Sequence, residues 1–218
     1  MIKDISDRKE AENLLIAAKE QAEAAEAELK KTQIKLERNN KILLKLINED
    51  PLTKIANRLC FDIRIRQEWK RLYREQQPLS LLLFDVDYFK YYNDLYGHPK
   101  GDTCLIKIAQ TVRKTLSRPA DLVARVGGEE FCVILPNTDL KGAIIVAERI
   151  HLAIKELEIT HEDSRLDNIN TITISVGISS QIPTADSSHN RLINQADQAL
   201  LEAKRQGRNQ SVIFSSMS

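Results

Sequence analysis

Hydrophobic positions in the first 49 residues recur at alternating spacings of three and four, and the stretch contains no glycine or proline. This is the heptad pattern of a coiled coil, in which the apolar seam faces a partner helix. We therefore expect residues 1–49 to form a long helix that pairs in parallel with a second copy. A single amphipathic helix packed on its own domain is the alternative. The seam positions are Leu15, Ala18, Ala22, Ala25, Leu29, Thr32, Leu36, Asn39, Leu43 and Leu46.

The seam has a second possible register. A shift by one residue gives Gln33, Asn40 and Ile47 in place of Thr32, Asn39 and Leu46. Leu29, Leu36 and Leu43 serve either register. We hypothesise that the helix pair rotates between the two registers to relay a signal. Cysteine crosslinking at positions 32 and 33 tests this hypothesis, because a single register under all conditions would exclude it.

After Asp50-Pro51 the pattern changes, because proline disfavours helix in the residue before it. Short apolar runs, which predict strands, now alternate with longer amphipathic segments, which predict helices. Helices and a hairpin on one sheet indicate an α/β or α+β domain, which we expect to span residues 50–218. The predicted strands are 79–87, 171–179 and 211–214 with a hairpin at 122–135; the predicted helices are 102–116, 140–157 and 190–206; polar residues 158–170 are predicted to form a loop.

The composition limits the classes of partner that the chain could bind. The chain has 32 Lys and Arg against 31 Asp and Glu, a net charge of +1, so it offers no electrostatic basis for binding nucleic acid or a membrane surface. No apolar run reaches the length of a membrane span, and the N-terminus lacks the apolar core of a signal peptide. The three cysteines lack metal-ligand spacing. We expect a cytoplasmic protein with reduced thiols and no membrane segment in this chain.

The hairpin carries the most informative motif, GGEEF at residues 127–131. Two glycines between apolar runs predict a tight turn, and Glu129 and Glu130 follow at the strand tip. Upstream, the strand 79–87 ends in Asp85 and Asp87, whose side chains leave on the same face. Carboxylates without histidine or thiolate favour Mg²⁺ or Mn²⁺, and Mg²⁺ held this way keeps positions for the phosphates of a nucleoside triphosphate. Solvated strand ends are the alternative.

Four further residues suit the two ends of a guanine nucleotide. Asp102 can accept from the N1–H and amine of guanine, and the Asn93 amide can donate to O6. Asp102 could instead cap a helix that begins there. Lys204 and Arg208 are four residues apart and could bind a triphosphate from one helix face, unless Gly207 ends the helix first. On their own, these two cations would be surface charges that complement the helix dipole.

Taken together, these motifs resemble the GGDEF family of diguanylate cyclases. The resemblance runs from about residue 48 to 215 with the motifs in order. It implies a palm-like GGDEF domain, with a mainly antiparallel sheet flanked by helices, preceded here by the long coiled-coil helix. The matching motifs are DPLT at 50–53, FDVDYFK at 84–90, ND at 93–94, GH at 97–98, GD at 101–102, GGEEF at 127–131, AK at 203–204 and GRN at 207–209.

The resemblance implies a homodimeric enzyme that condenses two GTP molecules into cyclic di-GMP and two pyrophosphates, with two Mg²⁺ or Mn²⁺ ions per active site. The metals would be bound by Asp85, the main chain of Val86, Glu129 and Glu130; which carboxylate takes the proton is left open. Asn93 and Asp102 match the guanine-reading positions. The remaining substrate-binding positions are Phe89 and Lys90, through their amides, and Lys204 and Arg208.

A second motif resembles the family's inhibitory product site. Arg118 and Asp121 form its RxxD pattern shortly before the GGEEF motif, and Arg149 matches a second product-binding arginine. The resemblance implies feedback inhibition by cyclic di-GMP; an ordinary surface turn with an ion pair is the alternative. Lys54 and Leu59 depart from the family pattern, which puts dimer contacts or loop geometry in doubt.

Two questions of context stay open. Residues 2–12 resemble the exit of a PAS sensor domain, which implies an upstream sensor in a longer protein, with a short free-standing protein as the alternative. The main rival function is a non-catalytic GGDEF domain that binds GTP or cyclic di-GMP as a sensor. A damaged acidic motif, the usual mark of that class, is absent here. A signalling adaptor that merely dimerises is a further rival.

Overall fold

The structure is a computed structural model that describes residues 19, 21–23, 25–39, 43–44 and 47–215. It divides into two compact units, Met1–Leu46 and Ile47–Ser218. In the first unit every described residue is helical and exposed, including the seam residues Leu29 and Leu36, which are 69% and 59% exposed. The helix is therefore as expected there, while its pairing with a second copy stays a prediction. Residues 2–12 and the seam positions Leu15, Ala18 and Leu46 lie outside the described residues.

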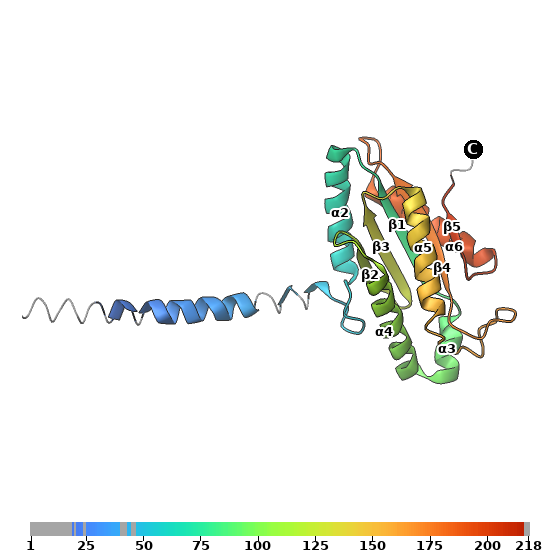
Figure 1. Cartoon of the computed structure of the whole chain (residues 1–218), viewed down its shortest axis with the longest axis horizontal. Coiled ribbons are helices and arrows are strands. Elements are labelled where there is room, and N and C mark those ends of the chain that lie inside the picture. Colours follow the sequence, from blue (N-terminus) through green and yellow to red (C-terminus); the bar gives the residue numbers. More distant parts are fainter. Residues whose placement is uncertain (1–18, 20, 24, 40–42, 45–46, 216–218) are drawn as a thin grey trace, which may run out of the picture. The chain divides into compact units, whose positions relative to one another are not determined.

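The second unit is built on a five-stranded sheet in the order β2-β3-β1-β4-β5 (Figure 1). The central strand β1 is buried at every position, as its apolar sequence LSLLLFDV requires. It pairs antiparallel with β3 and β4, while β5 runs parallel to β4 at the edge. The sheet is thus mainly antiparallel, as predicted. The strands are β1 (Leu79–Val86), β2 (Leu122–Gly127), β3 (Glu130–Pro136), β4 (Ile174–Gln181) and β5 (Ser211–Ile213).

Helices cover both faces of this sheet. One core cluster joins α3, α4 and α5 to alternate residues of β1 such as Phe84 and Val86. A second cluster joins α2 and α6 to the intervening residues such as Leu81 and Leu83. The two-residue period of the strand therefore places both faces of β1 in apolar layers. The helices are α2 (Arg58–Glu75), α3 (Phe89–Tyr96), α4 (His98–Thr115), α5 (Leu140–Lys155) and α6 (His189–Arg205).

The structure corrects several predicted elements. The helices α2 and α3 were not predicted. The predicted start of α4, at residue 102, was four residues too late, because the helix starts at His98 with Pro99 in its first turn. Residues 158–170, predicted to be a plain loop, contain antiparallel bridges and form an irregular hairpin. Among the described residues, none of the helices is both long and apolar enough to cross a membrane.

Candidate active site

The end of β1 meets the tip of the β2–β3 hairpin. Asp85 lies opposite Glu130 in the strand register, and the Val86 amide donates to the Glu129 carbonyl at 3.4 Å. Lys204, near the end of α6, reaches the same point, where its Nζ lies 3.0 Å from Asp85 Oδ2. The sheet and α6 therefore bring together these residues from three distant parts of the sequence.

The surroundings of Asp85 destabilise the ionised form of its carboxylate. Burial raises its pKa from 3.8 to about 6, the hydrogen bond and charge of Lys204 oppose this rise, and the charges of Glu129 and Asp87 add to it. The ionised side chain is only partly compensated by one ammonium group. A buried carboxylate of this kind favours a further cation close by.

Asp87 has a different role from the one its position suggested. Its Oδ2 accepts from Thr173 Oγ1 at 2.7 Å and from the Asn209 amide at 3.0 Å, and its Oδ1 accepts from Ser175 Oγ at 2.6 Å. The residue is 2% exposed. Asp87 therefore ties β1 to β4 and to the segment after α6, and both of its oxygens already have protein partners.

The donors at this strand end fit a magnesium ion. Within the part of the chain that the structure describes, no three His, Cys, Asp or Glu side chains group closely enough to hold a metal. Mg²⁺ is usually bound by one or two carboxylates, with waters and substrate phosphates completing its octahedron. Asp85, the hairpin glutamates and the Val86 carbonyl are oxygen donors of the kind from which such an incomplete set could be drawn.

Asn93 and Asp102 also come together. Asn93 lies on α3, and its buried Oδ1 has no hydrogen-bond partner among the described residues. This oxygen packs against Gly101, so closely that a Cβ there would overlap it. Asp102 follows directly and is exposed. Because α4 begins at His98, Asp102 stands inside the helix, and its interpretation as the helix cap is wrong.

The predicted phosphate-binding groups lie at the start of α3. This helix begins at Phe89, after Tyr88 in a left-handed conformation with φ 54°, and no side chain caps it. The first amides of a helix have no partner inside the helix, and they carry the positive end of its dipole. The amides of Phe89 and Lys90 are therefore suited to an anion, as the resemblance implies.

Arg208 reaches this region by an unexpected route. The α6 helix ends at Arg205, and Gly207 has φ 111°, so Lys204 and Arg208 do not share a helix face. The chain instead folds back, and Arg208 Nη1 donates to the Lys204 carbonyl at 3.4 Å and to Tyr88 Oη at 3.1 Å. Both cations thus lie near the start of α3, although not through the predicted helical spacing.

The RxxD residues form a turn beside a separate cavity of about 490 Å³. Arg118 and Asp121 both line it, and the Asp121 amide donates to the Arg118 carbonyl at 3.0 Å. Burial raises the pKa of Asp121, while the charges of Arg118 and Arg149 oppose the rise, so the three predicted residues influence one another. Asp121 Oδ1 is buried without a partner among the described residues, and Arg118 Nη1 donates to Thr138 Oγ1 at 2.9 Å.

Arg125, which was not among the predicted site residues, joins the start of this unit to the hairpin tip. Its Nη1 lies 3.2 Å from Asp50 Oδ1, and its Nε donates to the Gly128 carbonyl at 2.8 Å. Both side chains of the ion pair are mostly buried, at 16% and 15% exposed. Since Asp50 is far away in sequence, only its position in the DPLT motif could have indicated a role.

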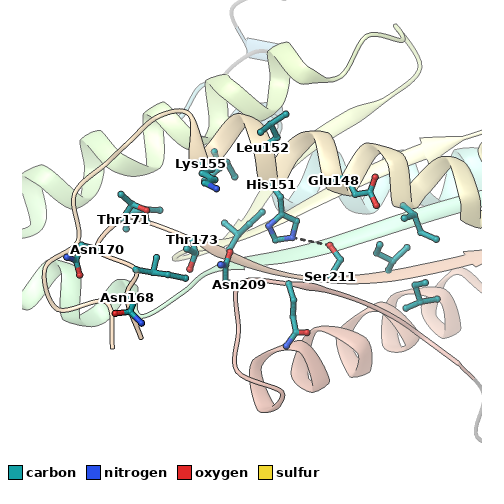
Figure 2. Close-up of a pocket in the computed structure, with 18 residues that line it drawn as sticks. Glu148, His151, Leu152, Lys155, Asn168, Asn170, Thr171, Thr173, Asn209 and Ser211 are labelled. Carbon is teal, nitrogen blue, oxygen red and sulfur yellow. Dashed lines mark hydrogen bonds between the residues drawn. The ribbon is translucent and has the colours of Figure 1, made fainter. Parts of the chain in front are cut away.

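A larger cavity, of about 840 Å³, lies between α5, residues 168–174 and β5 (Figure 2). None of the predicted site residues lines it. Figure 2 shows His151 near its centre, with Nε2 3.0 Å from Ser211 Oγ. Its wall includes Thr173 and Asn209, the partners of Asp87, so this cavity adjoins the support of the acidic strand end rather than the acids themselves.

The five-stranded, mainly antiparallel sheet flanked by helices, with acids at a strand end beside a helix N-terminus and two cations, defines the chain as a mixed α/β domain. The family can be stated more closely. Residues 47–210 match the model of the diguanylate cyclase GGDEF domain, and the chain belongs to this family.

Similar proteins agree with this assignment. Diguanylate cyclase A of Treponema denticola is 36% identical over 174 residues, which cover 78% of this chain and 45% of that protein. The coiled coil and GGDEF domain of DgcB from Caulobacter crescentus, solved with c-di-GMP, superposes with a TM-score of 0.73 at 27% identity, covering 86% of this chain and 98% of that one. The active GGEEF domain of a diguanylate cyclase from Vibrio cholerae gives 0.65 at 33%, covering 75% and 99%. The chain spans less than half the length of the curated relative.

Proposed function

We propose that this chain is a diguanylate cyclase that condenses two GTP molecules into cyclic di-GMP, working as a homodimer. The observation that carries the proposal is the buried Asp85, with its raised pKa and its contact with Lys204, opposite Glu130 at the hairpin tip. Relatives named as diguanylate cyclases support it. A solved active domain with the same GGEEF motif supports Glu129 in place of the family's aspartate.

In the reaction, the 3′-hydroxyl of each GTP attacks the α-phosphorus of the other and gives up its proton to Glu129 or Glu130, and the bond from each α-phosphorus to its pyrophosphate breaks. Bound Mg²⁺ would lower the pKa of the attacking hydroxyl and offset charge on the phosphates. Asp85, Glu129 and Glu130 would hold it with the Val86 carbonyl. Each copy would supply one GTP, so two sites must face each other, and a coiled coil would raise their effective concentration.

The substrate groups follow the geometry of α3 and α6. Asn93 and Asp102 would read guanine, the amides of Phe89 and Lys90 would bind phosphate oxygens, and Lys204 with Arg208 would pair with the triphosphate. Lys204 would have to exchange its contact with Asp85 for phosphate when a metal binds. That exchange would let the same ammonium stabilise the empty and the loaded site.

The test is to incubate the purified chain with GTP and MgCl₂ and to separate the products by chromatography. We expect cyclic di-GMP and pyrophosphate from GTP, nothing comparable from ATP, and no product from the Glu129→Ala, Glu130→Ala double variant. A dimeric native chain, stripped of bound nucleotide, that yields no cyclic di-GMP would refute the proposal and favour a non-catalytic sensor.

We also infer product inhibition through Arg118, Asp121 and Arg149. Support comes from the cavity beside the turn and from the buried, unpartnered Asp121 oxygen in the described part of the chain. Arginine can stack on guanine and pair with phosphate, while the Asp121 carboxylate can accept from a guanine edge. Added cyclic di-GMP should therefore inhibit the native enzyme and inhibit Arg118→Ala at least tenfold less strongly. Equal inhibition of both would exclude this site.

A further inference from the structure

Residues 159–172, which the sequence left without a function, form an irregular hairpin. The Ile172 amide donates to the Ile159 carbonyl at 2.8 Å, and the His161 amide donates to the Asn170 carbonyl at 2.8 Å. A bridge between Thr160 and Thr171 lies between these two bonds. Figure 1 shows this segment as the orange loop beside α3. Backbone hydrogen bonds within the hairpin therefore join its two arms, independently of its contacts with α3.

The first arm of this hairpin contacts one side of α3. His161 Nε2 lies 3.3 Å from the Tyr88 carbonyl, and the His161 ring stands edge-on to Tyr92 with centroids 5.4 Å apart. The Glu162 amide donates to Tyr96 Oη at 3.1 Å. Positions 88, 92 and 96 are four apart, so these contacts follow a single line along the helix.

A fourth contact lies beside this line. The guanidinium of Arg165 sits 3.5 Å from the centroid of the Tyr91 ring, which is close enough for a cation–π interaction. Tyr91 precedes Tyr92, so the hairpin contacts α3 over more than one row of side chains. The helix is therefore clamped from its first turn to its last residue.

The same helix carries the groups assigned to the nucleotide. Asn93 lies in its middle and the amides of Phe89 and Lys90 lie at its start. The Tyr88 carbonyl accepts the first helical hydrogen bond, from the Tyr92 amide at 3.2 Å, and His161 contacts that same carbonyl. Whatever fixes Tyr88 therefore fixes the direction of the amides that follow it.

His161 is built to act as a neutral donor. It is 1% exposed, and burial lowers its pKa, although the Tyr88 carbonyl and Asp163 oppose that effect. A carbonyl oxygen only accepts, so the hydrogen of the neutral ring must be on Nε2. Nδ1 is buried without a partner among the described residues, so within that part of the chain Nε2 makes the hydrogen bond of the ring. The Tyr88 contact is therefore the hydrogen bond that a substitution of His161 would remove.

We propose that His161 is a positioning residue for GTP binding, which holds the Tyr88 carbonyl and thereby sets the first turn of α3 and the guanine-reading Asn93. This inference rests on the proposed function. His161 would act through the helix, by its contacts with the Tyr88 carbonyl and the Tyr92 ring. Its loss should weaken nucleotide binding much more than it slows turnover at saturating GTP.

The test compares two substitutions at one position. His161→Gln places an amide nitrogen near the position of Nε2, whereas His161→Phe keeps a ring against Tyr92 and removes the donor. The probe is a GTP analogue with a methylene group between the α- and β-phosphorus atoms, titrated with Mg²⁺ by calorimetry. We expect about tenfold weaker binding for His161→Phe, affinity within about threefold of native for His161→Gln, and kcat within about threefold for both. His189→Gln, at the start of α6, is the matched control and should change nothing.

Two results would overturn the proposal: native affinity in His161→Phe, or equal losses in the Phe and Gln variants, which would indicate ring packing rather than donation. If His161→Phe does not fold, Tyr96→Phe serves instead, because it removes only the acceptor of the Glu162 amide. We then expect about threefold weaker binding, and unchanged binding would overturn the clamp. A native chain that binds the analogue but makes no cyclic di-GMP would refute the cyclase proposal while leaving the His161 comparison valid. Failure of the native chain to bind would refute both.

Discussion

Replacing Asp85 with asparagine should stabilise the metal-free protein while abolishing its activity. The pKa of Asp85 rises from 3.8 to about 6, which corresponds to roughly 3 kcal/mol acting against the ionised side chain. This value already includes the attraction of Lys204, which lies 3.0 Å away. Asparagine resembles the protonated acid in shape and charge, so the variant escapes the cost. For a domain of this size, roughly 3 kcal/mol corresponds to a melting temperature about 6–12 °C higher.

The stability difference between the native chain and Asp85→Asn should depend on pH in a definite direction. Because the pKa of Asp85 is higher in the folded than in the unfolded chain, the folded state binds the proton more tightly. The stabilisation from the protonated form is therefore present below pH 3.8 and is lost as pH rises through about 6. The advantage of Asp85→Asn should be full at pH 7.5 and should shrink to roughly 0.5 kcal/mol near pH 4, where the Asp85 side chain is neutral in the folded chain and only partly ionised in the unfolded chain.

The assay is thermal unfolding of both proteins across this pH range, first with a chelator and then with MgCl₂. Magnesium should raise the melting temperature of the native chain and leave that of Asp85→Asn nearly unchanged, since binding to the folded state stabilises it. A variant that melts below the native chain at pH 7.5, by a margin that does not change with pH, would refute the reasoning. Equal stabilisation of both proteins by magnesium would exclude Asp85 as a ligand of the metal.

Three further substitutions test residues of the candidate site other than Asp85. Gly101→Ala should force the Asn93 side chain aside and weaken GTP binding about tenfold in calorimetry, because the added Cβ would overlap Oδ1; native affinity would contradict this. Arg125→Gln should lower kcat about tenfold with little change in KM, since the hairpin tip loses its bond at Gly128; steady-state kinetics that match the native enzyme would exclude the role. Asp87→Asn should cost about 2–4 kcal/mol in urea unfolding, because two hydroxyls and an amide lose a charged acceptor; a loss below about 0.5 kcal/mol would show that the bonds contribute little.

The elements that the sequence predicted well are those with a strong apolar period. The strand predicted at 79–87 is observed as Leu79–Val86, and the helix predicted at 140–157 as Leu140–Lys155. By contrast, α2 carries so many charges that its apolar positions were overlooked, although Phe61, Ile65, Trp69 and Leu72 follow the helical spacing. Proline in the first turn of α4 was a further usable signal, since that residue favours helix starts.

The residues of the candidate site also fall into a group that the sequence could predict and a group that it could not. Residues that carry a family motif, such as Asp85 and Asn93, could be proposed from the sequence alone. Their supports could not, because each depends on tertiary packing between distant segments. Asp87 bonds Thr173 across 86 positions, and Arg125 pairs with Asp50 across 75. Nothing near those residues in the sequence marks the partner, so identical side chains could equally have been solvated surface groups.

Arg125 also takes part in a chain of hydrogen bonds that runs from residue 47 to the hairpin tip. The Asn57 side chain donates to the Ile47 carbonyl at 2.7 Å, and the Arg125 amide donates to the Ala56 carbonyl at 2.8 Å. The last helical residues before Asp50 are therefore joined to β2 through a short loop, and Arg125 continues the path to the hairpin tip.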